Sequence, residues 1–394
     1  MASEKSANSN IWKYYLATSL AQFAFYTPII QLFYLANNLT VFKIAILGVV
    51  WSIVRLLLEM PSSILADKWG RKRTIIISSI FAILQLLTLL YATNYWFFLL
   101  ASIWSAASYA FLSGTSVAFF YDNLKMLKRE HEFDKLWARQ EIYQQIPLII
   151  AFVSSGFLFK LSQLLPFQIS LIFLVFSLIV TLTLREPEYH KPIEEAGIFS
   201  HFKQSITYVF KNNCLKTILI FTILFSIGSD ISYGYGQIYL KQLALPVVLF
   251  GIVYTFKSLL VTLAANIAPS LRRRFSYQSM FAFQISAITI LLYLMVITES
   301  YILGAIYFIL IAIPYGFFII SKSSYVHEHI QSHHRATVDS MFSFSVALVI
   351  LIIEPIIGYL ADIYSIKLPF LLIAIVLSFY CVYFVTHERR KIIP

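Results

Sequence analysis

Long apolar runs separated by short polar segments make up almost the whole chain. A helix that crosses the ~30 Å hydrocarbon core of a bilayer needs about 20 apolar residues, and these runs have roughly that length. The pattern therefore predicts an all-α membrane protein. We expect twelve membrane-spanning helices, at residues 12–36, 43–65, 74–92, 96–121, 141–160, 166–185, 214–240, 246–269, 277–297, 301–321, 338–361 and 368–386.

The longest polar stretch between apolar runs extends from Glu186 to Asn213, and its prolines end the sixth predicted helix. It divides the chain into an N-terminal six-helix bundle at 1–190, a cytosolic linker at 191–213 and a C-terminal six-helix bundle at 214–394. Within the linker, apolar residues recur at helical spacing beside lysines. This favours an amphipathic helix on the inner leaflet over a plain linker, and its apolar residues are Phe202, Ile206, Val209 and Phe210.

Composition supports the membrane assignment. Hydrophobic residues make up 59% of the 394 positions and charged residues only 12%, with a mean hydropathy of +0.77. A soluble domain of this size could not cover its surface with so few charges. The polar start Met1–Asn10 leads into an apolar run too long for a signal peptide, so we expect the first helix to remain in the mature protein.

The basic residues behind the net charge of +11 are distributed as in a membrane protein, mostly on one side of the bilayer. With the N-terminus in the cytosol, 24 of the 30 Lys and Arg residues fall in cytosolic segments. This asymmetry predicts a multi-pass protein of the cytoplasmic (inner) membrane with both termini in the cytosol. The lipid bilayer therefore explains the basic residues, and we expect no nucleic-acid partner.

A charged hinge, Ala66–Arg73, joins the second and third predicted helices. Gly70 has no Cβ, so it can take a positive φ and let the chain turn. The hinge resembles motif A of the major facilitator superfamily, Gly-x-Leu-Ala-Asp-Arg-x-Gly-Arg-Lys. Ser63 stands at the first Gly and Lys68 at the first Arg, whereas Asp67, Gly70, Arg71 and Lys72 match. The resemblance implies two six-helix bundles that move a solute by alternating access.

The end of the fourth predicted helix carries a second resemblance. The run Ser113-Gly114-Thr115 to Tyr121-Asp122, with Glu59-x-Pro61 before the hinge, resembles a drug-exporter branch of the same superfamily. In the family, the motif A Asp faces the start of the eleventh helix and the Arg pairs with the fourth-helix acid. Carried over, Asp67 would face the amides near Thr337–Ser340 and Arg71 would pair with Asp122, which closes a cytosolic gate.

Two patterns of other branches are missing. The fifth helix lacks the Gly-Pro-Gly-Gly signature of many proton-coupled drug antiporters, and Pro147 with Ser154-Ser155-Gly156 replaces it poorly. After helix six the chain reads Arg185-Glu186-Pro187-Glu188 where sugar porters have Pro-Glu-Ser-x-x-Arg. We therefore expect no sugar substrate.

Charged residues inside apolar runs are costly, about 2.5–3.5 kcal/mol each on insertion scales, so they mark functional candidates. Arg55 and Glu59 are four apart, a spacing that lets them pair directly as a tuned proton site or as a static ion pair. Asp230 lies before Gly234 and Gly236, where we expect a broken helix. The remaining candidates for proton coupling or substrate binding are Lys257, which could neutralise Asp230, and Glu354.

A faint repeat links the two halves. Glu354 and Asp362 in the eleventh predicted helix have the same separation of eight as Glu59 and Asp67 in the second. Each pair also has a proline near its Glu, at Pro61 and Pro355. The repeat is compatible with a transporter built from related halves, and coincidence is an equal alternative.

A histidine-rich segment holds His327, His329, His333 and His334. It lacks the His-Glu-x-x-His pattern of metalloproteases, and we read it as a polar loop at headgroup level, with metal binding as the alternative. The chain has no Walker sequence. The chain therefore has no ATP site of its own, and we expect a proton gradient as the driving force and no cofactor. We find no set of nucleophile, base or metal ligands at membrane depth in the sequence, so we expect no enzyme activity and no metal site.

Aromatic and amide side chains lie in the helices that line the family's cavity. They suit an amphipathic organic solute held by ring contacts and a few hydrogen bonds. The candidates are Gln22, Tyr26, Gln31, Tyr143, Gln144, Tyr233, Gln237 and Tyr315. We expect a monomeric secondary transporter of a small organic molecule, with proton-coupled efflux by an antiporter as the leading interpretation. The alternative is a proton-coupled importer of a nutrient such as an amino acid or organic acid, with Arg55 or Lys257 on its carboxylate.

Overall fold

The computed structural model describes residues 2–187, 212–329 and 335–388, and these contain helices and no β-strand. The chain divides into two compact units. Unit 1 comprises Met1–Leu39 and Ile46–Glu194, and unit 2 comprises Thr40–Ala45 and Glu195–Pro394. The predicted amphipathic helix of the linker lies outside the described residues.

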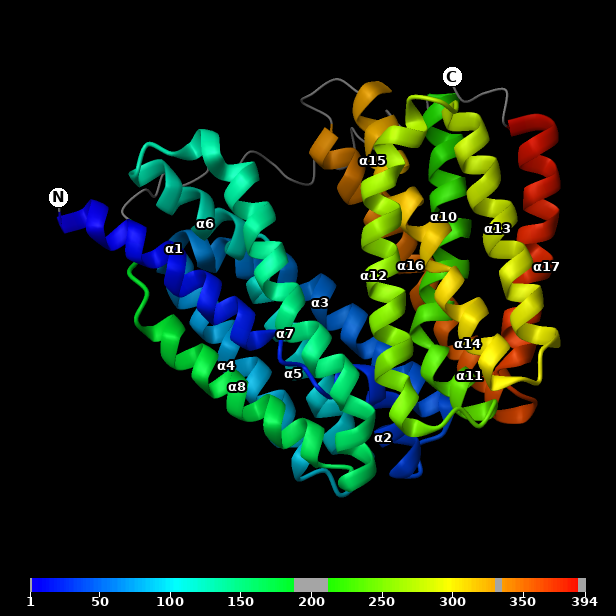
Figure 1. Ribbon diagram of the computed structural model, residues 1–394, viewed down its shortest axis with the longest axis horizontal. Helices are drawn as coiled ribbons and strands as arrows, with labels where there is room; N and C mark the ends of the chain where they lie inside the picture. Colours follow the sequence, from blue (N-terminus) through cyan, green and yellow to red (C-terminus); the bar gives the residue numbers. More distant parts are fainter. Residues whose placement is uncertain (1, 188–211, 330–334, 389–394) are drawn as a thin grey trace. The chain divides into compact units, whose positions relative to one another are not determined.

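The helices of unit 1 follow one another along the chain and lie side by side (Figure 1). Helix α4 packs against α5 and α8, and α1 packs against α6, α7 and α8. Aromatic residues of α1 and α6 form much of the core, where Tyr14 lies 5.6 Å from both Phe119 and Phe120 between ring centroids. The elements are α1 (Ala2–Ala21), η1 (Thr27–Ile29), α2 (Ile30–Ala36), α3 (Val41–Trp69), α4 (Arg71–Leu90), α5 (Tyr95–Leu112), α6 (Thr115–Met126), η2 (Glu130–Glu132), α7 (Phe133–Leu161) and α8 (Leu165–Leu182).

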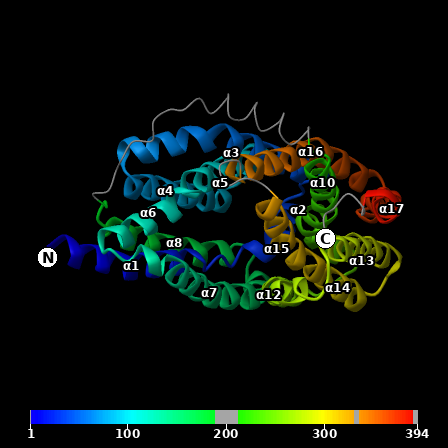
Figure 2. The ribbon, with the colours of Figure 1, turned by 90° about the horizontal axis from the view of Figure 1, so that it is seen from above.

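Unit 2 has the same all-helical construction, seen end-on in Figure 2. Helix α12 packs against α15, α13 packs against α15 and α17, and α10 packs against α16 and α17. The elements are α10 (Asn213–Gly234), α11 (Gly236–Gln242), α12 (Val247–Arg272), α13 (Tyr277–Ile297), α14 (Tyr301–Leu310), α15 (Ala312–His329), α16 (Arg335–Ile363), α17 (Lys367–Tyr383) and η4 (Phe384–Glu388).

In the part of the chain that the structure describes, 11 helical segments are long and apolar enough to cross a membrane. The predicted count of twelve is not reached because the first expected span, 12–36, is divided. Helix α1 ends at Ala21, and the chain turns before η1 and α2, which form one shorter apolar segment. In the turn between the two segments the amide of Phe25 donates to Ser170 Oγ at 2.9 Å, so it has no place in a helical hydrogen-bond ladder.

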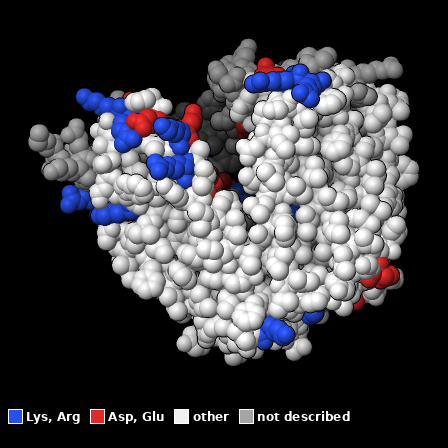
Figure 3. Space-filling model, in the orientation of Figure 1, with Lys and Arg blue, Asp and Glu red and all other residues white. Residues whose placement is uncertain are grey.

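Two further breaks lie inside expected spans. The expected helix 96–121 is divided into α5 and α6 at Gly114, whose φ is 72°. The expected break near Gly234 and Gly236 is confirmed, since α10 ends at Gly234 and α11 begins at Gly236. Figure 3 shows that charged side chains on the visible face gather toward the helix ends, while the flanks carry almost none. This distribution is what lipid contact along the flanks requires.

Candidate functional site

The motif A turn, residues Asp67–Lys72, lies between α3 and α4 in unit 1. Helix α3 ends at Trp69, and Gly70 reverses the chain with a φ of 100°, a conformation that residues with a Cβ rarely adopt. Gly70 is buried. A Cβ built at this position would lie 2.7 Å from the carboxylate of Glu186. Glycine is therefore required here by the backbone, and a residue with a Cβ would also displace the Glu186 carboxylate.

Glu186 caps the N-terminus of α4. Its Oε1 accepts a hydrogen bond from the amide of Arg71 at 2.6 Å, and its Oε2 accepts one from the amide of Lys72 at 2.9 Å. First-turn amides have no partner within their helix, and the helix dipole favours an anion at this end. This contact could not be predicted from the sequence, because no local spacing relates residue 186 to residue 71.

The side chain of Arg71 is held from two sides. Its Nη1 forms an ion pair with the buried carboxylate of Asp122, near the end of α6, and also donates to the backbone oxygen of Ala118. The structure thus contains the pair that the resemblance implies. Its role as a gate stays a prediction.

A second polar contact fixes the chain beyond α8. The Asn10 side chain accepts a hydrogen bond from the Arg185 amide at 3.0 Å and donates one to the Arg185 carbonyl at 2.8 Å. Asn10 also donates to Asn123 at 2.7 Å. Residue 185 directly precedes Glu186, so this contact helps to place the carboxylate that caps α4.

Asp67 is partly exposed and forms no hydrogen bond or ion pair with any residue that the structure describes. Its expected contact with the amides near Thr337–Ser340 stays a prediction.

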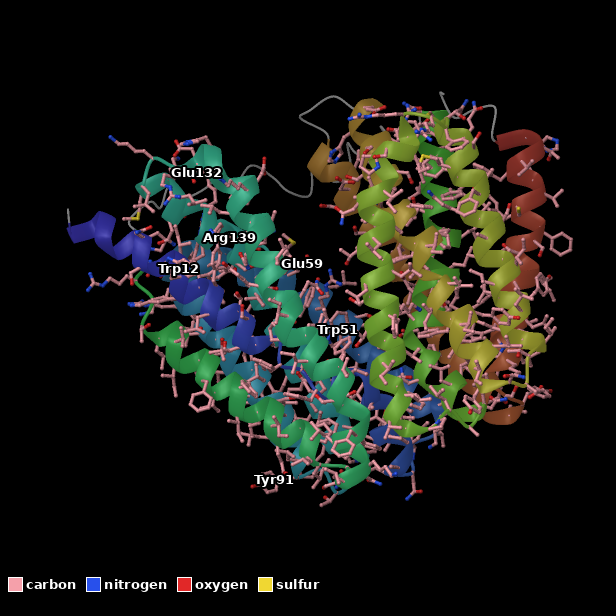
Figure 4. All side chains as sticks on the ribbon, viewed as in Figure 1. Trp12, Trp51, Glu59, Tyr91, Glu132 and Arg139 are labelled. Atoms are coloured by element: carbon pink, nitrogen blue, oxygen red, sulfur yellow. The ribbon has the colours of Figure 1, made fainter. Side chains whose placement is uncertain are left out.

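Arg55 and Glu59 lie one turn apart on α3 but form no ion pair, so the expected direct pairing is wrong for this structure. The guanidinium lies over the ring of Tyr109 at 4.6 Å and over that of Trp51 at 5.5 Å, measured to the ring centroids. Arg55 Nε is buried and has no hydrogen-bond partner. The i,i+4 spacing brings two side chains to one face, but electron-rich rings compete for a cation there. Figure 4 shows Trp51 and Glu59 on α3.

Unit 2 holds a buried lysine among aromatic rings. Lys257, on α12, is 5% exposed, and its Nζ has no hydrogen-bond partner. The Nζ lies 3.5 Å from the ring centroid of Phe308 and 5.2 Å from that of Tyr233. Asp230, on α10, interacts electrostatically with Lys257 and with Tyr315, and Ser229 Oγ donates to it at 3.4 Å. The structure therefore brings together four of the predicted residues, Asp230, Tyr233, Lys257 and Tyr315.

The break between α10 and α11 makes room for this cluster. A Cβ at Gly236 would overlap the ring of Phe308 and lie 3.0 Å from the hydroxyl oxygen of Tyr254. Tyr254 in turn packs edge-on against Tyr233, with ring centroids 5.7 Å apart. The sequence analysis missed Phe308 and Tyr254, which form part of the packing around Lys257. Their only signal in the sequence is the small residue at 236.

Glu354, on α16, does not join this cluster through any hydrogen bond or ion pair among the described residues. Its Oε2 is buried without a hydrogen-bond partner. An unpartnered carboxyl oxygen at membrane depth is costly if the group is ionised. Glu354 therefore remains a candidate for proton binding on its own.

The remaining cavity candidates are distributed over both units. Gln22 donates to Gln144 at 3.0 Å, which joins two of them. Tyr143 accepts a hydrogen bond from Arg139 Nε at 3.1 Å and packs against Trp12 and Tyr15, and Figure 4 places Arg139 toward the opposite end of unit 1 from Tyr91. The others pack or are buried: Tyr26 stacks on Phe167, Gln31 lies in α2, and Gln237 is buried in α11.

Polar residues also cluster at one end of unit 2. Glu328 accepts a hydrogen bond from the Tyr277 hydroxyl at 2.7 Å and lies 4.0 Å from Arg272. His327 Nε2 lies 2.9 Å from Asp339 Oδ2. The described residues contain no group of three or more potential metal ligands. The side chains of His329, His333 and His334 lie outside the described part of the chain.

Comparison with known proteins identifies the relatives of this chain. Residues 14–354 match the Major Facilitator Superfamily as a protein family. The uncharacterized MFS-type transporter YxaM of Bacillus subtilis (strain 168) is 24% identical over 234 residues. The match spans 58% of this chain and 58% of the relative's own length.

Three solved structures share the fold. A mutant of the nucleoside transporter NupG is 18% identical with a TM-score of 0.82, covering 95% of this chain and 100% of the other. A bacterial homolog of the human lysosomal transporter Spinster, inward-facing and occupied, is 12% identical with a TM-score of 0.72, covering 98% and 97%. A POT family transporter in complex with a thioalcohol-conjugated peptide is 9% identical with a TM-score of 0.75, covering 97% and 96%. At sequence identities this low, the similarity shows a shared fold and nothing more.

Proposed function

Because the chain belongs to the Major Facilitator Superfamily and is a multi-pass membrane transporter of that type, we propose that it moves a small amphipathic organic solute by proton-coupled alternating access. Export by exchange with protons is the proposed direction, and the cytoplasmic membrane, with both termini in the cytosol, is the proposed location. The protein works as a monomer without a cofactor.

The observation that carries this proposal is the cluster around Lys257. A buried ammonium without a hydrogen-bond partner destabilises a protein. Such a group is therefore usually present because it serves a function. The faces of Phe308 and Tyr233 compensate part of that cost through cation–π attraction. The same rings offer an amphipathic solute a surface to stack on, while Lys257 and Asp230 supply charges of both signs.

Proton coupling rests on the acids at membrane depth. Asp230, Glu59 and Glu354 are each without an ion pair among the described residues, so none has a cation to hold it permanently ionised at close range. An acid of this kind can take up and release a proton as its surroundings alternate between wet and dry. Asp230 is the principal coupling site in this proposal, because it alone interacts electrostatically with a buried cation.

A second candidate function is import of a carboxylate-bearing nutrient. The free Lys257 Nζ favours it, since an ammonium without a hydrogen-bond partner can bind a substrate carboxylate directly. Of the transporters of similar fold, one is named a nucleoside transporter and another is in complex with a thioalcohol-conjugated peptide. Both descriptions are compatible with a substrate that combines a ring or an apolar part with a few polar groups.

The experiment uses the purified full chain in proteoliposomes with an imposed pH gradient. Labelled amino acids, organic acids, nucleosides and amphipathic drugs are tested for flux in both directions, beside survival of an efflux-deficient host on toxic compounds. The variants are Asp230→Asn and Glu59→Gln, with Glu299→Gln as the control. Glu299 is 87% exposed in its pair with Lys367. The proposal expects gradient-driven flux that Asp230→Asn abolishes and the control retains; flux indifferent to the pH gradient contradicts proton coupling.

A further inference from the structure

The carboxylate of Asp362, near the end of α16, caps the N-terminus of α3. Its Oδ1 accepts a hydrogen bond from the amide of Val41 at 2.7 Å, and its Oδ2 accepts one from the amide of Phe42 at 2.9 Å. These are first-turn amides, which have no partner within their own helix. Both carboxylate oxygens are therefore used, at the positive end of the α3 dipole.

The contact around this carboxylate is close enough to involve the backbone. Gly358 lies one turn before Asp362, and a Cβ there would lie 2.7 Å from Phe42 Cα and 2.8 Å from Ala45 Cβ. Val41, Ile44 and Ala45 are buried. Glycine at 358 thus lets α16 touch the first turn of α3 directly, and Asp362 adds two directed hydrogen bonds to that packing.

Helix α3 is continuous, but its first turn and its remainder belong to different units. Thr40–Ala45 belongs to unit 2 together with α16, whereas the remainder of α3, from Ile46, belongs to unit 1. Helix α3 has 29 residues, a length of about 43 Å. The motif A turn lies at one end of this helix, and the Asp362 contact lies at the other.

We infer that Asp362 is a gating residue of transport, whose carboxylate holds the first turn of α3 to α16 within unit 2 and releases it once in each cycle. This inference rests on the proposed alternating access and adds a contact at the opposite end of α3 from the motif A turn. Asp362 repeats the spacing of Asp67, each lying eight residues after a membrane glutamate, at Glu354 and Glu59. Asp362 is also exposed, so water can replace the two amides when the contact opens.

The test measures how often this end of α3 opens. Val41 is 8% exposed, so in a background with Cys214 and Cys381 replaced by Ser, a Val41→Cys thiol reacts with a maleimide only when the contact is released. The chain is reconstituted in nanodiscs, where both faces are accessible, and the labelling rate is followed in Asp362→Ala, Asp362→Asn and Asp362→Glu. The control is Glu299→Gln, which also removes the charge of an acid. The partner of Glu299 is Lys367, which comes soon after α16 in the chain and lies at the same end of unit 2.

Loss of a capping carboxylate shifts a local equilibrium about 2- to 30-fold. Asp362→Ala is expected to raise the labelling rate by that factor, Asp362→Asn by less, and Asp362→Glu and Glu299→Gln not at all. Equal rates in the parent chain and in Asp362→Ala overturn the inference, and so does an equal rise in Glu299→Gln. If Asp362→Ala fails to fold, the labelling rates of Asp362→Asn and Asp362→Glu are compared instead. A higher rate in Asp362→Asn supports the inference, and equal rates overturn it. Labelling needs no substrate, so this result is separate from failure of the proposed function, which is an absence of solute flux in the parent chain.

Discussion

Arg71, the first residue of α4, forms an ion pair with Asp122, near the end of α6, and both side chains are largely buried. Two helices that are separated by α5 along the chain are thereby joined at one end of unit 1. Removing one partner leaves the other charge buried without compensation. The following predictions concern this pair, the turn beside it and the lysine cluster of unit 2.

Arg71→Ala is expected to lower the stability of unit 1 by about 3–5 kcal/mol, the usual cost of an unpaired buried charge. Arg71→Lys keeps the charge but cannot reproduce the planar fork that reaches Asp122 and the Ala118 carbonyl together, so its loss should be intermediate. Thermal unfolding of the purified variants measures the order. An Arg71→Ala protein as stable as the parent would mean that the pair contributes nothing to the fold.

Gly70→Ala should be more damaging than Gly114→Ala. Both glycines have a positive φ, and Gly70, with φ 100° and ψ 149°, lies in a region of backbone conformation that essentially only glycine adopts. At Gly114 a Cβ meets nothing within 4 Å, whereas at Gly70 it lies 2.7 Å from the Glu186 carboxylate. The difference in unfolding temperature between the two variants therefore combines the backbone strain at Gly70 with the Glu186 contact, and removal of the Glu186 side chain separates the two. Glu186→Ala combined with Gly70→Ala should reduce that difference, and an unchanged difference would contradict the capping role of Glu186.

Lys257→Met is expected to reduce solute flux about 10- to 150-fold, the equivalent of about 1.5–3 kcal/mol for a contact with a charged group. The methionine keeps most of the apolar length of lysine and needs no hydrogen bond, so the unfolding temperature should stay near that of the parent chain. Flux in proteoliposomes and thermal unfolding are measured on the same preparations. A large fall in stability with flux lowered only in proportion would instead identify Lys257 as a static structural residue.

Gly236→Ala should weaken transport while Gly234→Ala does not. The two residues flank the break between α10 and α11, but only at Gly236 would a Cβ overlap Phe308 and displace its ring from Lys257. At Gly234 a Cβ meets nothing within 4 Å. The Michaelis constant for the transported solute is the sensitive quantity, since the cluster is proposed to bind it. Equal Michaelis constants for the two variants would mean that Phe308 has no part in solute binding.

Much of the fold follows from local features of the sequence. Apolar length predicted the helices, and the glycines at 234 and 236 predicted the break in the seventh span. The first span was predicted as continuous because the apolar run passes through the turn after Ala21, where the amide of Phe25 bonds to Ser170, a residue far away in the sequence. Arg55 and Glu59 show a second limit: their spacing fixes a shared face, while the rings of Trp51 and Tyr109 decide where the guanidinium lies.

The capping contacts could not be predicted in this way. Glu186 and Arg71 are 115 residues apart, and Asp362 and Val41 are 321 residues apart. No periodicity relates such positions. The Arg71–Asp122 pair was expected only through resemblance to a family, because the residues themselves show a base and an acid near the ends of separate helices.

The bidentate contact of Asn10 with the backbone of Arg185 also bears on how the protein is made. The two residues are 175 positions apart, so the asparagine amide emerges from the ribosome long before its partner. At a synthesis rate of about 5–20 residues per second, the interval is roughly 9–35 s. During that time Asn10 can form its hydrogen bond with Asn123, which is made earlier, but not the two with the backbone of Arg185. The start of the first helix therefore gains its full set of hydrogen bonds only after the segment that follows α8 has been synthesised.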